Sequence, residues 1–260
     1  MKSRKILIAV IVILAVQLTA LLGAKPLYNL YRDISFGWEE RSEQEHIIKA
    51  HAETMGISYG EYPRSLIDLF ERNPETEGFV LNYPFHKDKK PDISGLDRET
   101  VPLFLQWDPM WGYRRYGSDF LAVTGCGPTC LAMVGYYLTG DVNMTPDAIA
   151  KFAQRNGYYE KGYGSSWTLI SQGGVDLGLT VKELPLVEKK ISDALEEGNP
   201  VILALGPGDF TSSGHYIVLT GVEEAGYRVN DPNSRVNSEK LWTYEALEDQ
   251  IRNIWVISKE

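Results

Sequence analysis

The sequence contains very little cysteine and histidine, which limits the chemistry that it can carry. Among 260 residues there are two cysteines, Cys126 and Cys130, and four histidines. Two cysteines four residues apart on one helix lie on one face, but helical geometry does not suit a disulfide between them. Neither a C-x-x-C nor an H-x-x-x-H pair is present. We therefore expect no disulfide scaffold and no zinc site.

The sequence also lacks an excess of positive charge. Its formal net charge is −9, which argues against a nucleic-acid partner, because such proteins usually carry a basic face. Hydrophobic residues make up 43% and charged residues 23% of the chain, as in ordinary globular proteins. The length allows one or two domains with a sizeable core.

One long apolar run lies at the N-terminus, over residues 6–23, directly after Lys2, Arg4 and Lys5. As a helix it would span about 27 Å, close to the thickness of a bilayer core. Residues 1–24 are therefore expected to be a transmembrane signal anchor or a cleaved signal peptide; the length of the run and Leu22 at position −3 favour the anchor. Either way, the basic flank predicts that the remaining chain lies outside the cytoplasm, bound to the membrane or secreted.

Residues 25–100 are expected to form a mostly helical, membrane-proximal region and linker. The pattern predicts surface helices over residues 38–55 and 65–71, a short strand over 79–83 and a charged linker over 86–92. No residue in this region suggests catalysis, so we expect a stalk or cap.

Residues 101–260 differ from residues 25–100 in their sequence pattern: helical patterns come first, and strand patterns dominate later. This order predicts an α+β domain rather than a doubly wound sheet. The predicted strands cover residues 101–105, 179–184, 201–205, 215–220 and 226–230, and a last strand over 254–257 is expected to close the sheet. The predicted helices follow Cys126, begin at Pro146 with Thr145 as N-cap, follow the glycine-rich loop 162–167, and cover residues 191–197.

Cys126 is the strongest candidate for chemistry. It lies in Gly-Cys-Gly-Pro-Thr, which predicts a loop that delivers the cysteine to the start of a helix. Free N–H groups and the helix dipole at such a position lower the pKa of a thiol and favour the thiolate. The alternative is a small buried residue before a helix, as most free cysteines are.

A nucleophilic cysteine needs a base, and the base needs a group that orients it. His215 is the only histidine after Cys126, and it opens an apolar strand. Asp231 ends the next strand before Pro232 and could hold the imidazole tautomer, with Asn230 as a substitute. The alternatives are a structural histidine and an ordinary turn aspartate.

Gln106 is the fourth candidate. An amide side chain ahead of the nucleophile can donate to the oxyanion of a tetrahedral intermediate, together with the Cys126 N–H. Its alternative is a polar loop residue. The order Gln, Cys, His, Asp, each at the boundary of an element, is a stronger signal than any one residue.

The motifs that carry these residues resemble the C39-like cysteine peptidase family, which has a papain-like fold with a helical half and an antiparallel sheet half. The motifs are QWDPMWG, YG, GCGPTCLAM, GHYIVLTG and VNDP, and the resemblance covers residues 101–260. It implies that Cys126 is the nucleophile, His215 the base, Asp231 the orienting carboxylate and Gln106 the oxyanion-hole donor. Cys130 departs from the family pattern, which more often has a small hydroxyl residue or alanine there.

The function implied is hydrolysis of an amide bond in a protein or a cell-wall peptide, without a cofactor or metal. A double-glycine leader, the substrate of the bacteriocin-exporter members, is not expected without an ATPase or multi-span segment. Two alternatives remain open: a non-hydrolytic surface module that binds a peptide or partner protein, and acyl transfer to an amine. An aromatic cluster (Trp107, Trp111, Tyr113, Tyr116) and the loop 162–167 could line the cleft or pack in the core.

Overall fold

The computed structural model describes residues 42–259. The N-terminal apolar run, with its expected signal anchor or signal peptide, lies outside the described residues. Within residues 42–259 no helix has both the length and the apolar character needed to cross a bilayer. Residues 48–260 form one unit, and the described residues before Ile48 belong to a separate N-terminal unit.

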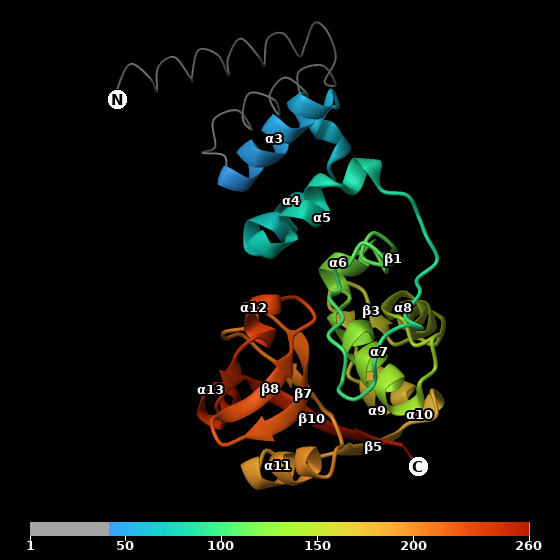
Figure 1. Ribbon diagram of the computed structural model, residues 1–260, viewed down its shortest axis with the longest axis vertical. Coiled ribbons are helices and arrows are strands. Elements are labelled where there is room, and N and C mark those ends of the chain that lie inside the picture. Colours follow the sequence, from blue (N-terminus) through green and yellow to red (C-terminus); the bar gives the residue numbers. More distant parts are fainter. Residues whose placement is uncertain (1–41, 260) are drawn as a thin grey trace, which may run out of the picture. The chain divides into compact units, whose positions relative to one another are not determined.

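The described part of the chain starts with helical segments, and its last strands form a sheet, as Figure 1 shows. The described helices are α3 (Glu43–Met55), α4 (Arg64–Arg72), α5 (Glu77–Leu81), α6 (Leu121–Thr124), α7 (Cys126–Thr139), α8 (Pro146–Arg155), α9 (Thr168–Ser171), α10 (Gly173–Asp176), α11 (Glu188–Glu196), α12 (Arg235–Ser238) and α13 (Tyr244–Glu248). Short 3-10 turns are η1 (Tyr59–Glu61), η2 (Pro74–Thr76) and η3 (Tyr83–Phe85).

A six-stranded sheet with the order β5-β10-β6-β7-β8-β9 forms the second half of the unit. Its strands are β5 (Thr180–Glu183), β6 (Val201–Leu205), β7 (His215–Glu223), β8 (Gly226–Asn230), β9 (Leu241–Trp242) and β10 (Ile251–Ser258), and every neighbouring pair is antiparallel. The expectation that the last strand closes the sheet is wrong. β10 lies inside the sheet, because β5 pairs with its outer side.

The core strands of the sheet are buried on both faces, since their side chains alternate between two apolar clusters. In β6, Ile202 and Ala204 pack with α7, whereas Val201 and Leu203 pack on the opposite face with α11. This explains why β6 reads as a continuous apolar run rather than as an alternating one.

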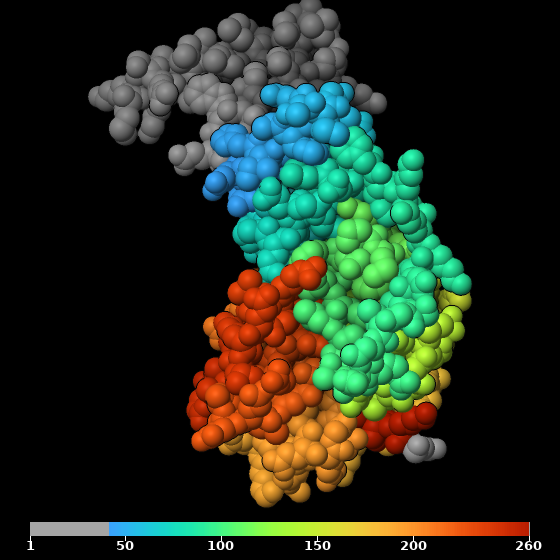
Figure 2. Space-filling model, viewed as in Figure 1, coloured from blue at the N-terminus to red at the C-terminus, as the bar shows by residue number. Residues whose placement is uncertain are grey.

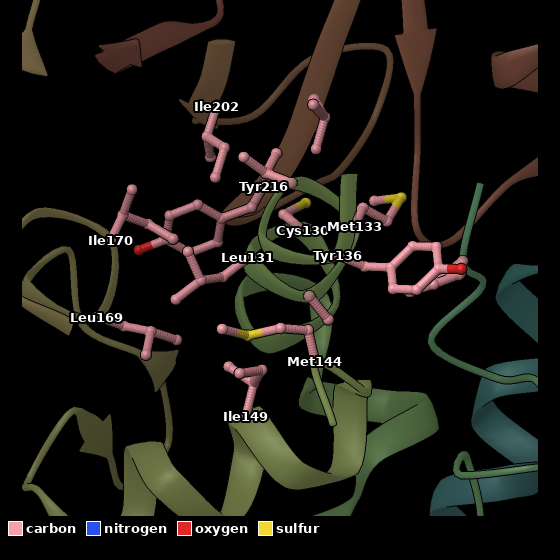
Figure 3. Close-up of a cluster of buried hydrophobic side chains, with 14 of the residues drawn as sticks. Cys130, Leu131, Met133, Tyr136, Met144, Ile149, Leu169, Ile170, Ile202 and Tyr216 are labelled. Atoms are coloured by element: carbon pink, nitrogen blue, oxygen red, sulfur yellow. The ribbon is translucent and has the colours of Figure 1, made fainter. Parts of the chain in front are cut away.

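Helix α7 is the centre of the helical half. Figure 3 shows Leu131 and Met133 of this helix among side chains from the sheet, from α8 and from α9. All residues from Gly127 to Tyr136 are buried. The helix ends at Gly140, whose φ of +72° gives the left-handed cap that a residue with a side chain would adopt only with strain.

Two of the predicted elements are wrong. Residues 79–83 do not form a strand, because Phe79 and Val80 are the buried side of the short helix α5. Residues 101–105 are not in a strand either, although Val101, Phe104 and Leu105 are buried. The segment runs extended over the helical half, and its apolar side chains mimic a strand pattern without sheet pairing (Figure 1).

Small two-stranded hairpins complete the described elements. β1 (Arg115–Tyr116) pairs with β2 (Asp119–Phe120), and β3 (Tyr159–Glu160) pairs with β4 (Gly164–Ser165). The β3–β4 hairpin occupies the glycine-rich loop before α9, where the sequence predicted only an irregular loop. It matters for the site because it forms one wall of the cleft described below.

Candidate active site

Cys126 is the first residue of α7 and is half-buried. The first N–H groups of a helix have no intrahelical acceptor, so the Cys126 N–H lies at the positive end of the helix. Thr129 closes the first turn by donating its N–H to the Gly125 carbonyl, 3.0 Å away. The helix behind this turn is buried from Gly127 to Tyr136, so the backbone at Cys126 is held in place.

Cys130 lies one turn further along α7 and is completely buried. Burial is the largest cause that raises the pKa of the Cys130 thiol well above its usual value, and the charges of the nearby Cys126 and Asp231 raise it further. A buried neutral thiol is a poor nucleophile. The two cysteines thus have opposite surroundings although they share one helix.

His215 and Asp231 are brought together by the register of β7 and β8. Val218 pairs with Asn230, so the next step along the ladder brings Asp231 beside Ile217, two residues from His215. Diagonal neighbours of this kind lie on one face and within reach of a long side chain. The His215 Nε2 lies 2.7 Å from the Asp231 Oδ1.

Burial, Asp231 and Cys126 all act on the pKa of His215. Burial lowers the pKa, but the charge and hydrogen bond of Asp231 and the interaction with Cys126 together raise it more, and the net result is a pKa of about 10. A buried carboxylate hydrogen-bonded to Nε2 thus favours the charged form of the ring. A charged imidazole is the partner that a thiolate nucleophile requires.

Asp231 is itself held by several donors, because it is fully buried and an unpaired buried carboxylate would be costly. The Asn233 N–H donates to Oδ1 at 2.8 Å, and the Asn237 Nδ2 donates to Oδ2 at 2.8 Å. The bond from Asn233 is a turn bond between residues i and i+2. Asp231 is thus a turn aspartate and a partner of His215 at once, which the sequence reading had treated as alternatives.

Gln106 is hydrogen-bonded to two segments of the site but is not among the residues that line its cleft. Its backbone N–H donates to the Pro232 carbonyl at 2.7 Å, and its Nε2 donates to the Ala122 carbonyl at 2.7 Å. Ala122 lies four residues before Cys126, so the buried Gln106 side chain connects the Asp231 loop to the approach to α7. An Nε2 group carries two hydrogens, and the bond to Ala122 uses one of them.

A cleft of about 450 Å³ opens beside these residues. Cys126 and His215 line it, together with residues of the β3–β4 hairpin, of β6 and of the segment before α9. Asp231 lies behind His215 rather than in the cleft. The two groups that would meet a substrate are therefore exposed to the cleft, and the carboxylate that supports them is not.

Ser165 holds the hairpin wall of the cleft by hydrogen bonds to β1 and β7 and lies close to the first turn of α7. The Tyr116 hydroxyl and the Ser165 hydroxyl are 2.7 Å apart, and the Tyr216 hydroxyl donates to the Ser165 carbonyl at 3.2 Å. Gly127 allows this close approach, because a Cβ there would lie 2.8 Å from the Ser165 Cβ. The sequence reading missed Ser165 and Tyr216; the Ser-Ser that follows Gly164 carried no signal of these bonds.

The expected aromatic lining divides into two groups. Trp107, Trp111, Tyr113 and Tyr116 are buried and do not line the cleft, whereas Tyr163 and Trp167 of the loop 162–167 do line it. Both of these side chains are exposed. Among residues 42–259, no group of three or more His, Cys, Asp and Glu side chains could hold a metal ion.

A comparison with known protein families identifies the family of this chain. The profile of the Peptidase_C39 like family matches residues 98–260, which is more than half of the chain. The chain therefore belongs to this peptidase family, and the resemblance drawn from its motifs is confirmed. The curated proteins include no significant match.

Two solved structures are similar to this chain. The peptidase domain of Streptococcus ComA, described as a bi-functional ABC transporter involved in a quorum sensing pathway, is 17% identical, with a TM-score of 0.41 over 53% of this chain and 93% of that chain. A C39-like peptidase from Bacillus anthracis is 15% identical, with a TM-score of 0.37 over 66% of this chain and 99% of that chain.

Proposed function

We propose that the chain is a papain-like cysteine peptidase that hydrolyses an amide bond through Cys126, His215 and Asp231. The observation that carries the proposal is that the half-buried Cys126 and His215 line the same cleft, while the buried Asp231 lies 2.7 Å from the His215 ring. A nucleophile, a base and an orienting group in this order are what acyl transfer by a thiol requires.

In the proposed reaction, the Cys126 thiolate attacks the carbonyl carbon of the scissile amide. A carbon–sulfur bond forms, and the carbonyl oxygen becomes an oxyanion near the Cys126 N–H and the Gln106 amide. The imidazolium of His215 gives its proton to the leaving nitrogen as the carbon–nitrogen bond breaks. His215 then takes a proton from water, which attacks the thioester and releases the acid and the thiolate.

Asp231 acts on the ring rather than on the substrate. By accepting from Nε2, it leaves Nδ1 toward the thiol and stabilises the charged ring. This role agrees with the raised pKa of His215, for which the charge of Asp231 is the largest favourable cause.

The proposed substrate is a protein or a cell-wall peptide outside the cytoplasm. The location rests on the basic and apolar pattern of residues 1–24, which suggests a membrane anchor or an export signal. An open cleft with exposed aromatic side chains suits an extended peptide better than a small metabolite.

The test compares the wild-type chain with Cys126→Ala on a peptide library and on isolated peptidoglycan, with the products identified by mass spectrometry. We expect cleaved products from the wild type alone. Cys130→Ala is the matched control, because it removes the other thiol and should keep the activity. Hydrolysis by Cys126→Ala at the wild-type rate would refute the proposal.

A further inference from the structure

A short turn outside the family match contacts the loop that carries Asp231. Residues 73–76 precede residue 98, where the family profile begins. Yet the Asn73 Nδ2 donates to the Asn233 carbonyl at 2.6 Å, and the Glu75 carboxylate accepts from the Ser234 hydroxyl at 2.5 Å and from the Arg235 N–H at 2.8 Å. These bonds join positions about 160 residues apart, and Figure 2 shows the two segments in contact.

The turn is built to present these side chains. The Asn73 Oδ1 accepts from the Glu75 N–H, and the Thr76 hydroxyl donates to the Asn73 carbonyl. Pro74 fixes φ at the start of η2, and Thr76 is completely buried. A preformed turn of this kind loses little conformational entropy when its carboxylate accepts two bonds.

The contacted loop, residues 231–238, supplies the donors that hold Asp231. Besides the bonds from Asn233 and Asn237, the Ser238 hydroxyl accepts from the Asp231 N–H at 2.9 Å. The Ser234 hydroxyl also accepts from the Asn237 N–H, so Ser234 links the Glu75 carboxylate to the residue that donates to Asp231. The Asn233 carbonyl, which accepts from the Asn73 Nδ2, also accepts from the Trp107 Nε1 at 2.9 Å.

We propose that Glu75 is a positioning residue for the site: by holding Ser234 and Arg235, it keeps loop 231–238 in the conformation that presents Asp231 to His215. The proposal rests on the proposed function, because it gives the helical region before residue 98 a part in the same reaction. It also changes the expected role of that region, which the sequence suggested was a stalk or cap.

The expected effect follows from the bonds. Glu75→Ala removes both acceptors, and Glu75→Gln keeps one acceptor but places an NH2 group against a donor. Because hydrogen bonds to charged groups are the stronger ones, we expect Glu75→Ala to lower kcat about tenfold, with Glu75→Gln in between. Glu77→Gln is the matched control: Glu77 is exposed, and among residues 42–259 no hydrogen bond or ion pair of its carboxylate is found.

The experiment measures the rate of Cys126 alkylation by iodoacetamide against pH in the full chain, with the alkylated residue identified by mass spectrometry. Asp231 and Cys126 are the groups that raise the pKa of His215, so a displaced Asp231 should move the basic limb of the profile to lower pH. We expect this shift for Glu75→Ala and Glu75→Gln, and a wild-type profile for Glu77→Gln. Thermal melting of each variant separates this effect from a loss of stability.

A lower melting temperature with an unchanged pH profile and kcat would overturn the proposal, since Glu75 would then be structural only. If Glu75→Ala does not fold, Glu75→Gln and Asn73→Ala give the same readout. A wild-type profile that is unchanged by His215→Ala would instead overturn the proposed function itself. The two failures are therefore distinguishable.

Discussion

The helical half and the sheet half of the site hold their groups by different means. Cys126 has its position because the turns of α7 behind it are enclosed by apolar side chains. His215 and Asp231 have theirs because strand register and a set of hydrogen bonds fix a buried carboxylate. We therefore expect substitutions of the buried apolar residues around α7 to change mainly the free energy of unfolding. Substitutions of the polar residues around Asp231 should change mainly the pH dependence of the reaction.

The largest expected effect separates the two cysteines of the helical half. Cys126→Ala should lower the rate of peptide hydrolysis by about a thousandfold or more, because it removes the nucleophile. Cys130→Ala should retain activity and cost about 1 kcal/mol of unfolding free energy, since it removes one small buried atom group. Urea unfolding and a peptide-cleavage assay measure both effects; equal activity losses in the two variants would contradict this division.

In the sheet half, Asp231→Asn should lower kcat by roughly 10²–10⁴-fold, because an amide can fix the ring but supplies no negative charge. The pKa of His215 should fall, because the charge of Asp231 is the main cause that raises it. NMR titration of the histidine ring checks this directly. A ring that still titrates near pH 10 in Asp231→Asn would contradict the assignment.

Leu131→Ala tests the packing side of the comparison. Leu131 is completely buried in the cluster around α7, so its truncation should cost about 2–5 kcal/mol of unfolding free energy. The pH profile of Cys126 alkylation should keep its shape, because no polar bond to His215 is changed. Chemical denaturation and the alkylation profile together give the result, and a shifted profile would show that the two halves are coupled.

The raised pKa of His215 also predicts how stability depends on pH. The folded ring has a pKa of about 10, above the usual 6.5, so the folded chain binds the proton more tightly than the unfolded chain. This contribution to stability is complete below pH 6.5 and is lost as the pH rises from 6.5 to about 10. The unfolding free energy of the wild type should fall across that range, and Asp231→Asn should reduce the slope.

The smallest expected effect concerns the cleft wall. Trp167 is about half exposed and lines the cleft, while its ring lies edge-on to the buried Trp255. Trp167→Ala should raise KM for a peptide by about tenfold, which corresponds to about 1.4 kcal/mol of lost aromatic contact, and change kcat little. Steady-state kinetics measure the two constants; a change confined to kcat would contradict a binding role.

Sequence patterns predicted the local elements well where one residue determines an end. The strands β6 and β8 have the predicted bounds, and α7 ends at Gly140 as expected. The pattern failed where burial and pairing are decided at long range. Residues 101–105 are as apolar as a strand, but among the described residues they pair with no strand. The internal position of β10 follows only from the order of the complete sheet.

The candidate site shows the same limit. Cys126, His215, Asp231 and Gln106 could be selected from their order and flanking residues, and the first three do lie at or next to the end of a helix or strand. The donors to Asp231 could not, since Asn233 and Asn237 look like ordinary turn residues. The contact of Glu75 with the Ser234 loop had no signal in the sequence, because nothing local relates residues so far apart.

The close approach at Gly127 has a consequence for how this chain can vary. The residue after the thiol also sets the spacing between α7 and the hairpin wall, because Ser165 occupies the place where a side chain would be. Two adjacent residues, Cys126 and Gly127, therefore determine the location of the sulfur and the distance between α7 and the hairpin. Evolution of a new specificity could change the tip of the hairpin, but it would have to keep these two residues.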